Sequence, residues 1–249
     1  MLHPSPLFHP AGDSAIQVEV GDGISIEVNR YVHALDAALR KTGTCGIADI
    51  VPAYRSLLVA FDPLVIASSE VKAIVAATWL ELKDSGDAAA RLVRVPACYG
   101  GEFGPDLEFV AAHAGITSRE VIEIHSAGIY TVYMMGFSPG FAYLGGLSPR
   151  IRTPRLETPR TEIPAGSIGI AQDQTGIYPV ASPGGWRLIG RTPITLFNPG
   201  TVPPTAVEPG DSMQFVPVDE ATYRAIEQEV RAGRYRVERI GQRAGSPCR

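Results

Sequence analysis

The first part of the chain switches between strand-like and helix-like hydrophobic patterns. Residues 14–20 alternate apolar and polar positions, as in a strand with one buried face. Residues 24–40 then place their apolar side chains at helical spacing. The elements expected here are a strand at 14–20, a helix at 24–40, strands at 47–51 and 54–61, a helix at 71–82 capped by Ser68 or Ser69, and a strand at 90–96. This order predicts a split βαβ (ferredoxin-like) domain over residues 1–96, with helices covering one face of a sheet.

The pattern changes after Pro96, where short apolar runs lie between prolines and glycines. From residue 129 to 217, short strands alternate with turn sequences such as Ser-Pro-Gly and Asn-Pro-Gly, which indicates a β-barrel or sandwich. The helices expected in this part are at 106–113, at 118–126 with Thr117 as the cap, and at 220–231. We therefore expect a second domain over residues 97–249.

Composition excludes several classes of protein. The 249 residues are 45% hydrophobic and 19% charged, which is typical of globular domains, and the formal charge of −4 gives no cationic field for nucleic acid or anionic membrane. No apolar run approaches the roughly 20 residues of a membrane span, and residues 1–10 do not resemble a signal peptide. Cys45, Cys98 and Cys248 form no C-x-x-C pair, so we expect neither disulfides nor a zinc site. These features predict a cytoplasmic protein.

The distribution of lysine limits how the chain could bind nucleotide. Lysine occurs only at positions 41, 72 and 83, and no Gly-x-x-x-x-Gly-Lys phosphate loop is present. The second domain also has no lysine to carry biotin or to form a Schiff base. Any phosphate would have to be bound by arginines and backbone amides, or by a partner.

The sequence Gly136-Phe-Ser-Pro-Gly140 matches the Gly-x-Ser-x-Gly pattern of a hydrolase nucleophile elbow. In such an elbow, the N–H of the residue after the serine forms part of the oxyanion hole, and Pro139 has no N–H. Loss of one oxyanion donor typically lowers the rate by about 10²–10³-fold. We therefore predict a Pro-Gly turn here and no Ser138 nucleophile.

Four segments of the second domain are unusually specific. They contain Tyr-Gly-Gly-Glu-Phe-Gly-Pro-Asp (from residue 99), Gly-Phe-Ser-Pro-Gly-Phe-Ala-Tyr-Leu-Gly-Gly (from 136), Thr-Pro-Arg-Thr-Glu-Ile-Pro-Ala-Gly-Ser (from 158) and Ser-Pro-Gly-Gly-Trp-Arg-Leu-Ile-Gly-Arg-Thr-Pro (from 182). Over essentially its whole length, the chain resembles the family that includes 5-oxoprolinase B subunits, KipI-type inhibitors of sporulation histidine kinases and allophanate hydrolase subunit 1. Glu162 replaces a basic residue of typical members, and Gln172-Asp173-Gln174 replaces a glycine-rich run, which leaves the natural substrate open.

The resemblance implies an α+β protein with a cyclophilin-like β-barrel after the first domain, similar to part of the carboxyltransferase domain of urea carboxylase. It also implies an enzyme subunit that is inactive alone. Together with a C subunit, in a heterotetramer, and a separate lactam-cleaving A subunit, it would open 5-oxoproline to glutamate. ATP, shared with or bound by the partner, would supply the energy, Mg²⁺ would enter with ATP, and no biotin would be attached to this chain.

Arginine and neutral polar side chains are the candidate ligand-binding groups. Guanidinium groups suit carboxylate and phosphate, amide and phenol groups suit a lactam, and aromatic rings could line a flat pocket. The anion-binding candidates are Arg155, Arg160, Arg187 and Arg191. The neutral candidates are Gln172, Gln174 and Tyr178, and the wall candidates are Phe137, Phe141, Tyr143 and Trp186. Loop ion pairs and core packing are the structural alternatives for these residues.

His125 and Glu102 are the candidates for proton transfer. His125 ends a predicted helix, where it could carry a proton or stabilise the helix end as a cation. Glu102 lies in a glycine-rich loop, where a general base and a solvated acid are both possible.

Three other functions stay open at this stage. A KipI-type inhibitor would dock its exposed loops on a sensor histidine kinase. A carboxyltransferase or allophanate hydrolase role would need a separate biotin carrier, because the second domain has no lysine. Peptidyl-prolyl isomerase activity rests on the fold analogy alone.

Overall fold

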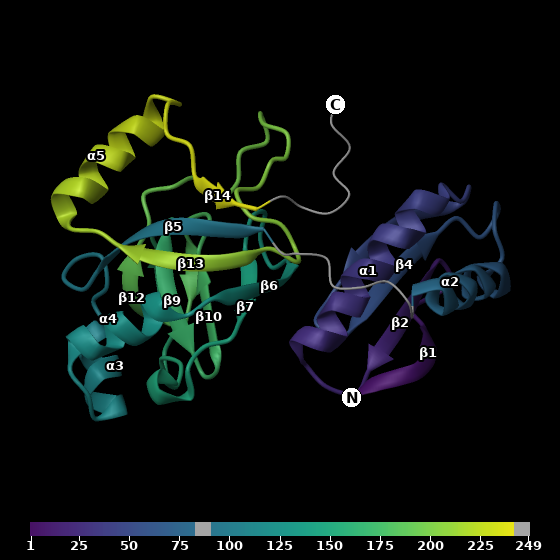
Figure 1. Cartoon of the computed structure of the whole chain (residues 1–249), viewed down its shortest axis with the longest axis horizontal. Coiled ribbons are helices and arrows are strands. Elements are labelled where there is room, and N and C mark those ends of the chain that lie inside the picture. Colours follow the sequence, from purple (N-terminus) through teal and green to yellow (C-terminus); the bar gives the residue numbers. More distant parts are fainter. Residues whose placement is uncertain (83–90, 242–249) are drawn as a thin grey trace. The chain divides into compact units, whose positions relative to one another are not determined.

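The computed structural model describes residues 1–82 and 91–241 (Figure 1). The chain forms two compact units that divide between residues 88 and 89. Each unit has its own hydrophobic core. No helix within the two described ranges is long and apolar enough to cross a membrane.

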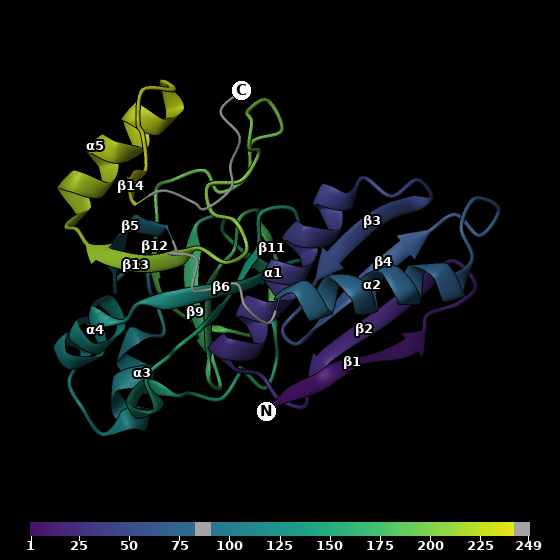
Figure 2. The ribbon, with the colours of Figure 1, turned by 45° about the vertical axis from the view of Figure 1, so that its right-hand side comes forward.

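The first unit is a four-stranded antiparallel sheet with two helices packed on it (Figures 1 and 2). Its elements are β1 (Leu2–Pro10), β2 (Ala15–Gly21), α1 (Ile26–Thr42), β3 (Ile47–Pro52), β4 (Ser56–Phe61) and α2 (Ser68–Leu82), with the strand order β1-β2-β4-β3. Alternation turns Val18 and Val59 toward the helices, where they join Leu35 and Trp79 in the buried core. The predicted split βαβ fold is therefore confirmed.

The edge strand β1 was not expected from the sequence. It occupies the position beside β2 where the prediction placed residues 90–96. Pro4, Pro6 and Pro10 obscure the strand pattern, but an edge strand tolerates proline because its outer N–H groups need no partner. The 90–96 prediction is wrong: those residues belong to β5 (Leu92–Tyr99), which pairs with strands of the second unit, so the boundary lies before residue 96.

Local capping explains where the helices begin. The Ser25 hydroxyl accepts a hydrogen bond from the Val28 N–H at the start of α1. Ser68 already belongs to α2, so the expected serine cap is wrong; the Glu70 carboxylate instead accepts from the Ala67 N–H.

The second unit is a barrel. The strand order β12-β9-β10-β7-β6-β13-β5 is closed by pairing of β12 with β5, which gives seven strands. These strands are β5, β6 (Tyr130–Met135), β7 (Ala142–Gly145), β9 (Ser167–Ala171), β10 (Gln174–Ile177), β12 (Arg187–Arg191) and β13 (Ser212–Pro217), and β14 (Glu238–Ile240) pairs with β5 as well. Closure leaves few unpaired edges.

Two hydrophobic clusters are associated with the barrel. Ile168, Ile170 and Ile189 point into it, while Ala171 and Leu188 point to the opposite face, because side chains alternate along a strand. The small sheet of β8 (Arg160–Ile163) and β11 (Ser182–Gly184) contributes to this outer cluster. The helices of this unit are α3 (Leu107–Ala114), α4 (Ser118–Ala127), α5 (Glu220–Arg231) and the short 3₁₀ helix η1 (Pro149–Ile151). Thr117 caps α4, as predicted, in a reciprocal pair with Glu120.

Candidate functional site

The four predicted wall aromatics belong to one cluster outside the barrel, around Phe141. Its ring centroid lies 5.5 Å from Phe137, 5.0 Å from Tyr143, 5.7 Å from Tyr178 and 5.8 Å from Trp186. Phe141, Tyr178 and Trp186 are buried, whereas Phe137 is 70% exposed. The buried rings therefore pack as core, which was the alternative to a pocket wall.

Glycines allow Trp186 to lie directly on the barrel. A Cβ added at Gly169 would come within 3.0 Å of the Trp186 Cβ, and one at Gly176 within 3.0 Å of its Cζ3. The absence of side chains on β9 and β10 thus makes room for the indole ring.

Asp106 connects two of the predicted anion-binding arginines. Its Oδ1 accepts a hydrogen bond from Arg160 Nη2 at 2.9 Å and lies 4.0 Å from Arg187 Nη1. Its Oδ2 accepts from the Leu188 N–H at 2.7 Å. The guanidinium of Arg187 also lies 3.6 Å from the ring centroid of Phe109 on α3, a cation–π geometry. We call Asp106, Phe109, Arg160 and Arg187 the arginine cluster.

The loop of residues 100–106 fixes Asp106 in place. The Gly100 N–H donates to the Ile189 carbonyl, and the Asp106 N–H donates to the Leu188 carbonyl. A Cβ at Gly104 would lie 2.0 Å from the Ile189 oxygen, so only glycine allows this approach to β12. The glycine-rich motif therefore has a direct structural function.

Sequence reasoning missed Asp106 because its position points to another role. It precedes α3 at the N-cap position, yet its side chain makes no capping hydrogen bond. The available signal was its place in the Gly-Pro-Asp motif.

Arg155 lies near this cluster, and Arg191 contacts other residues. Burial raises the pKa of Tyr178, while the positive charges of Arg155 and Arg160 act in the opposite direction, so both arginines lie close to that phenol. The Arg191 guanidinium lies 5.9 Å from the Phe103 ring centroid. The Nε atoms of Arg187 and Arg191 are buried without a hydrogen-bond partner among the described residues.

The two predicted glutamines flank the turn between β9 and β10. Gln172 is exposed, has a positive φ of 54°, and donates its backbone N–H to the Thr153 carbonyl at 2.7 Å. Gln174 begins β10 and is half-buried. No contact of the arginine cluster given above includes either side chain.

His125 occupies a closed position in the barrel core. It is fully buried, with Nδ1 2.7 Å from the Tyr99 hydroxyl and Nε2 3.0 Å from Thr175 Oγ1. Thr175 Oγ1 donates its proton to the Gly169 carbonyl, so it accepts from His125 Nε2–H, and Nδ1 accepts from Tyr99. Burial lowers the pKa of His125 to about 3. Both expected roles, proton carrier and helix-end cation, are therefore corrected: the ring is a neutral structural link.

Glu102 and Ser138 do not form a catalytic pair with a base. The Glu102 side chain is 62% exposed and forms an ion pair with Arg224 of α5, which is the solvated-acid alternative. The Ser138 hydroxyl is buried without a partner in the described parts of the chain, and strand β7 follows it where an elbow would have a helix. The predicted Pro-Gly turn is consistent with both observations.

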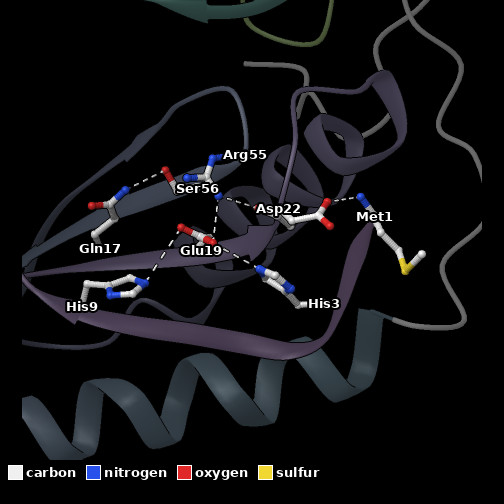
Figure 3. Close-up of polar contacts among 9 residues, drawn as sticks. Met1, His3, His9, Gln17, Glu19, Asp22, Arg55 and Ser56 are labelled. Atoms are coloured by element: carbon white, nitrogen blue, oxygen red, sulfur yellow. Dashed lines mark hydrogen bonds and ion pairs between the residues drawn. The ribbon is translucent and has the colours of Figure 1, made fainter.

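A separate polar cluster lies on the sheet of the first unit. Figure 3 shows Glu19 of β2 with Arg55 Nη1 at 2.8 Å, His3 Nε2 at 3.2 Å and His9 Nε2 at 3.9 Å. These contacts, the His3 hydrogen bond first, lower the pKa of Glu19. Within residues 1–82 and 91–241, no group of three or more His, Cys, Asp or Glu side chains is arranged to hold a metal.

Comparison with known proteins gives the class to which this fold belongs. The family described as carboxyltransferase domain, subdomain C and D, matches residues 6–207, so the chain belongs to that family. The predicted family and the predicted fold class are thereby confirmed.

Within this class, the chain is similar to 5-oxoprolinase B subunits over nearly their whole length. It is 45% identical to the 5-oxoprolinase B subunit of Bacillus subtilis, covering 88% of this chain and 95% of that protein. Identity to the protein of the same name in Escherichia coli O157:H7 is 37%, over 84% and 94% of the two chains. The urea amidolyase of Saccharomyces cerevisiae is 24% identical over 95% of this chain but 14% of its own length.

Solved structures show the same relationship. The uncharacterized protein PH0987 of Pyrococcus horikoshii is 51% identical, with a TM-score of 0.52 over 87% of this chain and 100% of its own. TTHA0988 is 34% identical with a TM-score of 0.73 over 82% of this chain, which spans 40% of the TTHA0988 chain. The urea amidolyase of K. lactis, at 21% identity and a TM-score of 0.78 over 96% of this chain and 17% of its own, shows the shared fold.

Proposed function

We propose that this chain is the B subunit of an ATP-dependent 5-oxoprolinase, inactive alone, that acts with a C subunit and a separate A subunit to convert 5-oxoproline to glutamate. The observation that carries this proposal is identity of 45%, 37% and 42% over 94–95% of the length of three proteins named as B subunits of 5-oxoprolinase. Identity to the urea amidolyases is 24% and 22%, over 14% and 15% of their length. Lactam opening is therefore favoured over carboxyl transfer.

The chemistry requires activation of a stable amide. Resonance makes the lactam carbonyl a poor electrophile, and transfer of a phosphoryl group from ATP to its oxygen would make it a good one. Phosphoryl transfer depends on positioning and on cationic stabilisation of charged oxygens. Mg²⁺ would enter as its complex with ATP, which is held by the C subunit or shared with it, in a heterotetramer of B and C subunits.

The arginine cluster is the proposed anion-binding part of this chain. Arg187 keeps a buried Nε without a partner and stacks on Phe109, while Arg160 is 30% exposed at its side chain and can donate to a ligand. Guanidinium groups match carboxylate and phosphate oxygens with two parallel hydrogen bonds. Asp106 positions both arginines, and Arg155 adds positive charge nearby.

The test is reconstitution of the three purified subunits. We expect ATP hydrolysis that depends on 5-oxoproline and disappears when this chain is omitted. No such hydrolysis at any Mg²⁺ concentration or at any pH in the neutral range would contradict the proposal.

Substitution of Arg187 tests its assigned role within the same complex. Loss of a charged hydrogen bond typically costs about 1.5–3 kcal/mol, so Arg187→Ala should raise the KM for 5-oxoproline or ATP by about 10- to 100-fold. Arg234→Ala is the matched control, because Arg234 forms an exposed ion pair with Glu229 and such pairs contribute about 0–1 kcal/mol. Equal kinetics for both variants would exclude Arg187 from the site.

A further inference from the structure

Three loops of the second unit meet at an uncharged surface. They are the β6–β7 loop, the segment after β10 and the segment after β12. A Cβ at Gly140 would lie 2.7 Å from the Phe197 Cβ and 3.3 Å from the Pro179 Cβ, and Thr205 lines the same hollow as residues 135–140. We call residues 136–140, 179–180 and 197–205 the uncharged rim.

The rim lacks charge in a chain where charge is otherwise common. Residues 128–149, 174–186 and 192–207 contain no Asp, Glu, Lys or Arg, although 19% of the chain is charged. The cores of protein–protein interfaces are depleted in charged residues and enriched in aromatic ones. This composition does not suit an anionic ligand, which the arginine cluster suits.

Large apolar side chains protrude from the rim. Phe137 is 70% exposed, Val180 39% and Val202 101%. Beside Phe137 lies a hollow of about 400 Å³, open to solvent and lined by Met135, Pro139 and Thr205 together with the intervening loop backbone. An exposed aromatic next to an apolar hollow is the arrangement of an interface anchor.

The backbone at Phe137 strengthens this interpretation. Its φ is 67°, in the left-handed region that disfavours residues with a Cβ, at an expected cost of about 1–3 kcal/mol. One edge-to-face contact with Phe141 offsets part of this cost. Most of the ring contacts nothing within the described residues that would repay the rest, whereas a bound partner would.

The relatives indicate which partner covers such a surface. The family is described as subdomains C and D of a carboxyltransferase domain, and the chain spans 40% of TTHA0988 and 17% of the K. lactis urea amidolyase. Those longer chains carry further segments in the same polypeptide. A chain limited to subdomains C and D needs them from a second polypeptide.

We propose that the uncharged rim is the docking surface for the polypeptide that supplies those segments, with Phe137 inserted into an apolar, uncharged face of that partner. The inference rests on the proposed function, in which this partner is the C subunit. It adds the location of the interface and its anchor residue.

Binding of the full-length chain to purified C subunit, followed by calorimetry, tests the proposal. Phe137→Gly removes the ring and suits the positive φ, so it should leave folding intact while weakening the complex at least about 30-fold. Val202→Asp, which inserts a charge at the rim, should weaken it comparably. Ile129→Asp is the matched control, because Ile129 is 60% exposed and lies at the opposite end of β6; it should retain an affinity within about 3-fold of wild type.

Each other outcome overturns the proposal. Wild-type affinity in both rim variants, or failure of the wild-type chain to bind the C subunit, excludes the rim as the docking surface. An unchanged affinity with a raised KM for 5-oxoproline identifies a small-molecule site, and a homodimer disrupted by Val202→Asp identifies a second copy as the occupant. Failure of the proposed function is distinguishable, because it shows as absent turnover in the complete three-subunit mixture, whatever the affinity of the rim variants.

Discussion

At His125, the balance between desolvation and hydrogen bonding determines the protonation state. A buried imidazolium would need a compensating anion, whereas the neighbours of His125 are the neutral Tyr99 and Thr175. Burial also raises the pKa of Tyr99 well above its ordinary value, so its hydroxyl keeps the proton that it donates. The neutral ring therefore connects α4 to β5 and β10.

This arrangement predicts a pH dependence of stability. The folded imidazole protonates near pH 3 and the unfolded one near pH 6.5, so between these values the unfolded chain binds more protons. Lowering the pH from 6.5 toward 3 should reduce the free energy of unfolding by up to about 1.4 kcal/mol per pH unit from this residue. Urea unfolding of wild type and His125→Gln between about pH 7 and about pH 4 measures it: the gap between the two proteins should narrow on acidification. Parallel curves would contradict the predicted neutral state.

The sequence indicates residue types at the site better than it indicates geometry. Arg160 and Arg187 are separated by 27 positions, and nothing in their spacing shows that both approach Asp106. Whether Asp106 caps α3 or turns toward β12 depends on a close backbone approach that only the folded chain creates. The aromatic candidates were correctly expected to be apolar, but spacing could not distinguish a wall from a packed cluster.

At the scale of elements, patterns predicted most helices and strands, and failures have identifiable causes. β1 escaped because prolines interrupt its alternation, which only an edge position permits. β5 was found but placed in the wrong sheet, because periodicity identifies a strand and not its partner. The barrel was expected from dense turn signals, whereas its closure through β5 and β12 depends on long-range pairing.

Packing of the 100–106 loop on β12 makes a specific prediction. Gly104→Ala places a methyl group 2.0 Å from the Ile189 carbonyl oxygen, so the loop or the strand must move. We expect a loss of at least about 2 kcal/mol in the free energy of unfolding of the second unit. The control Gly185→Ala, whose added Cβ has its nearest neighbour at 3.7 Å, should change stability by less than about 1 kcal/mol. Urea titration followed by fluorescence would separate them, and equal losses would argue against the close contact.

For the whole molecule, the two units differ in how far apart along the chain their partners lie. In the first unit, the most distant sheet pairing joins Ala15 to Ala60. In the barrel, Leu92 pairs with Ser212. Non-local pairing slows folding because a long loop must close before the contacts form.

The two tryptophans make this difference measurable. Trp79 is buried in the first unit and Trp186 in the second. In refolding of the full chain, fluorescence of Trp186→Phe, which reports Trp79, should recover faster than that of Trp79→Phe, which reports Trp186. Simultaneous recovery in both variants would show that one cooperative step governs both units.

The pairing of β5 with β13 also has a consequence during synthesis on the ribosome. Strand β5 leaves the exit tunnel 120 residues before the strand that completes its parallel ladder, from Leu92 to Ser212. At about 5–20 residues per second, its apolar edge waits roughly 6 to 24 seconds for that neighbour. A nascent barrel is thus open to chaperones and to self-association for that interval, while the preceding sheet already has all its strands.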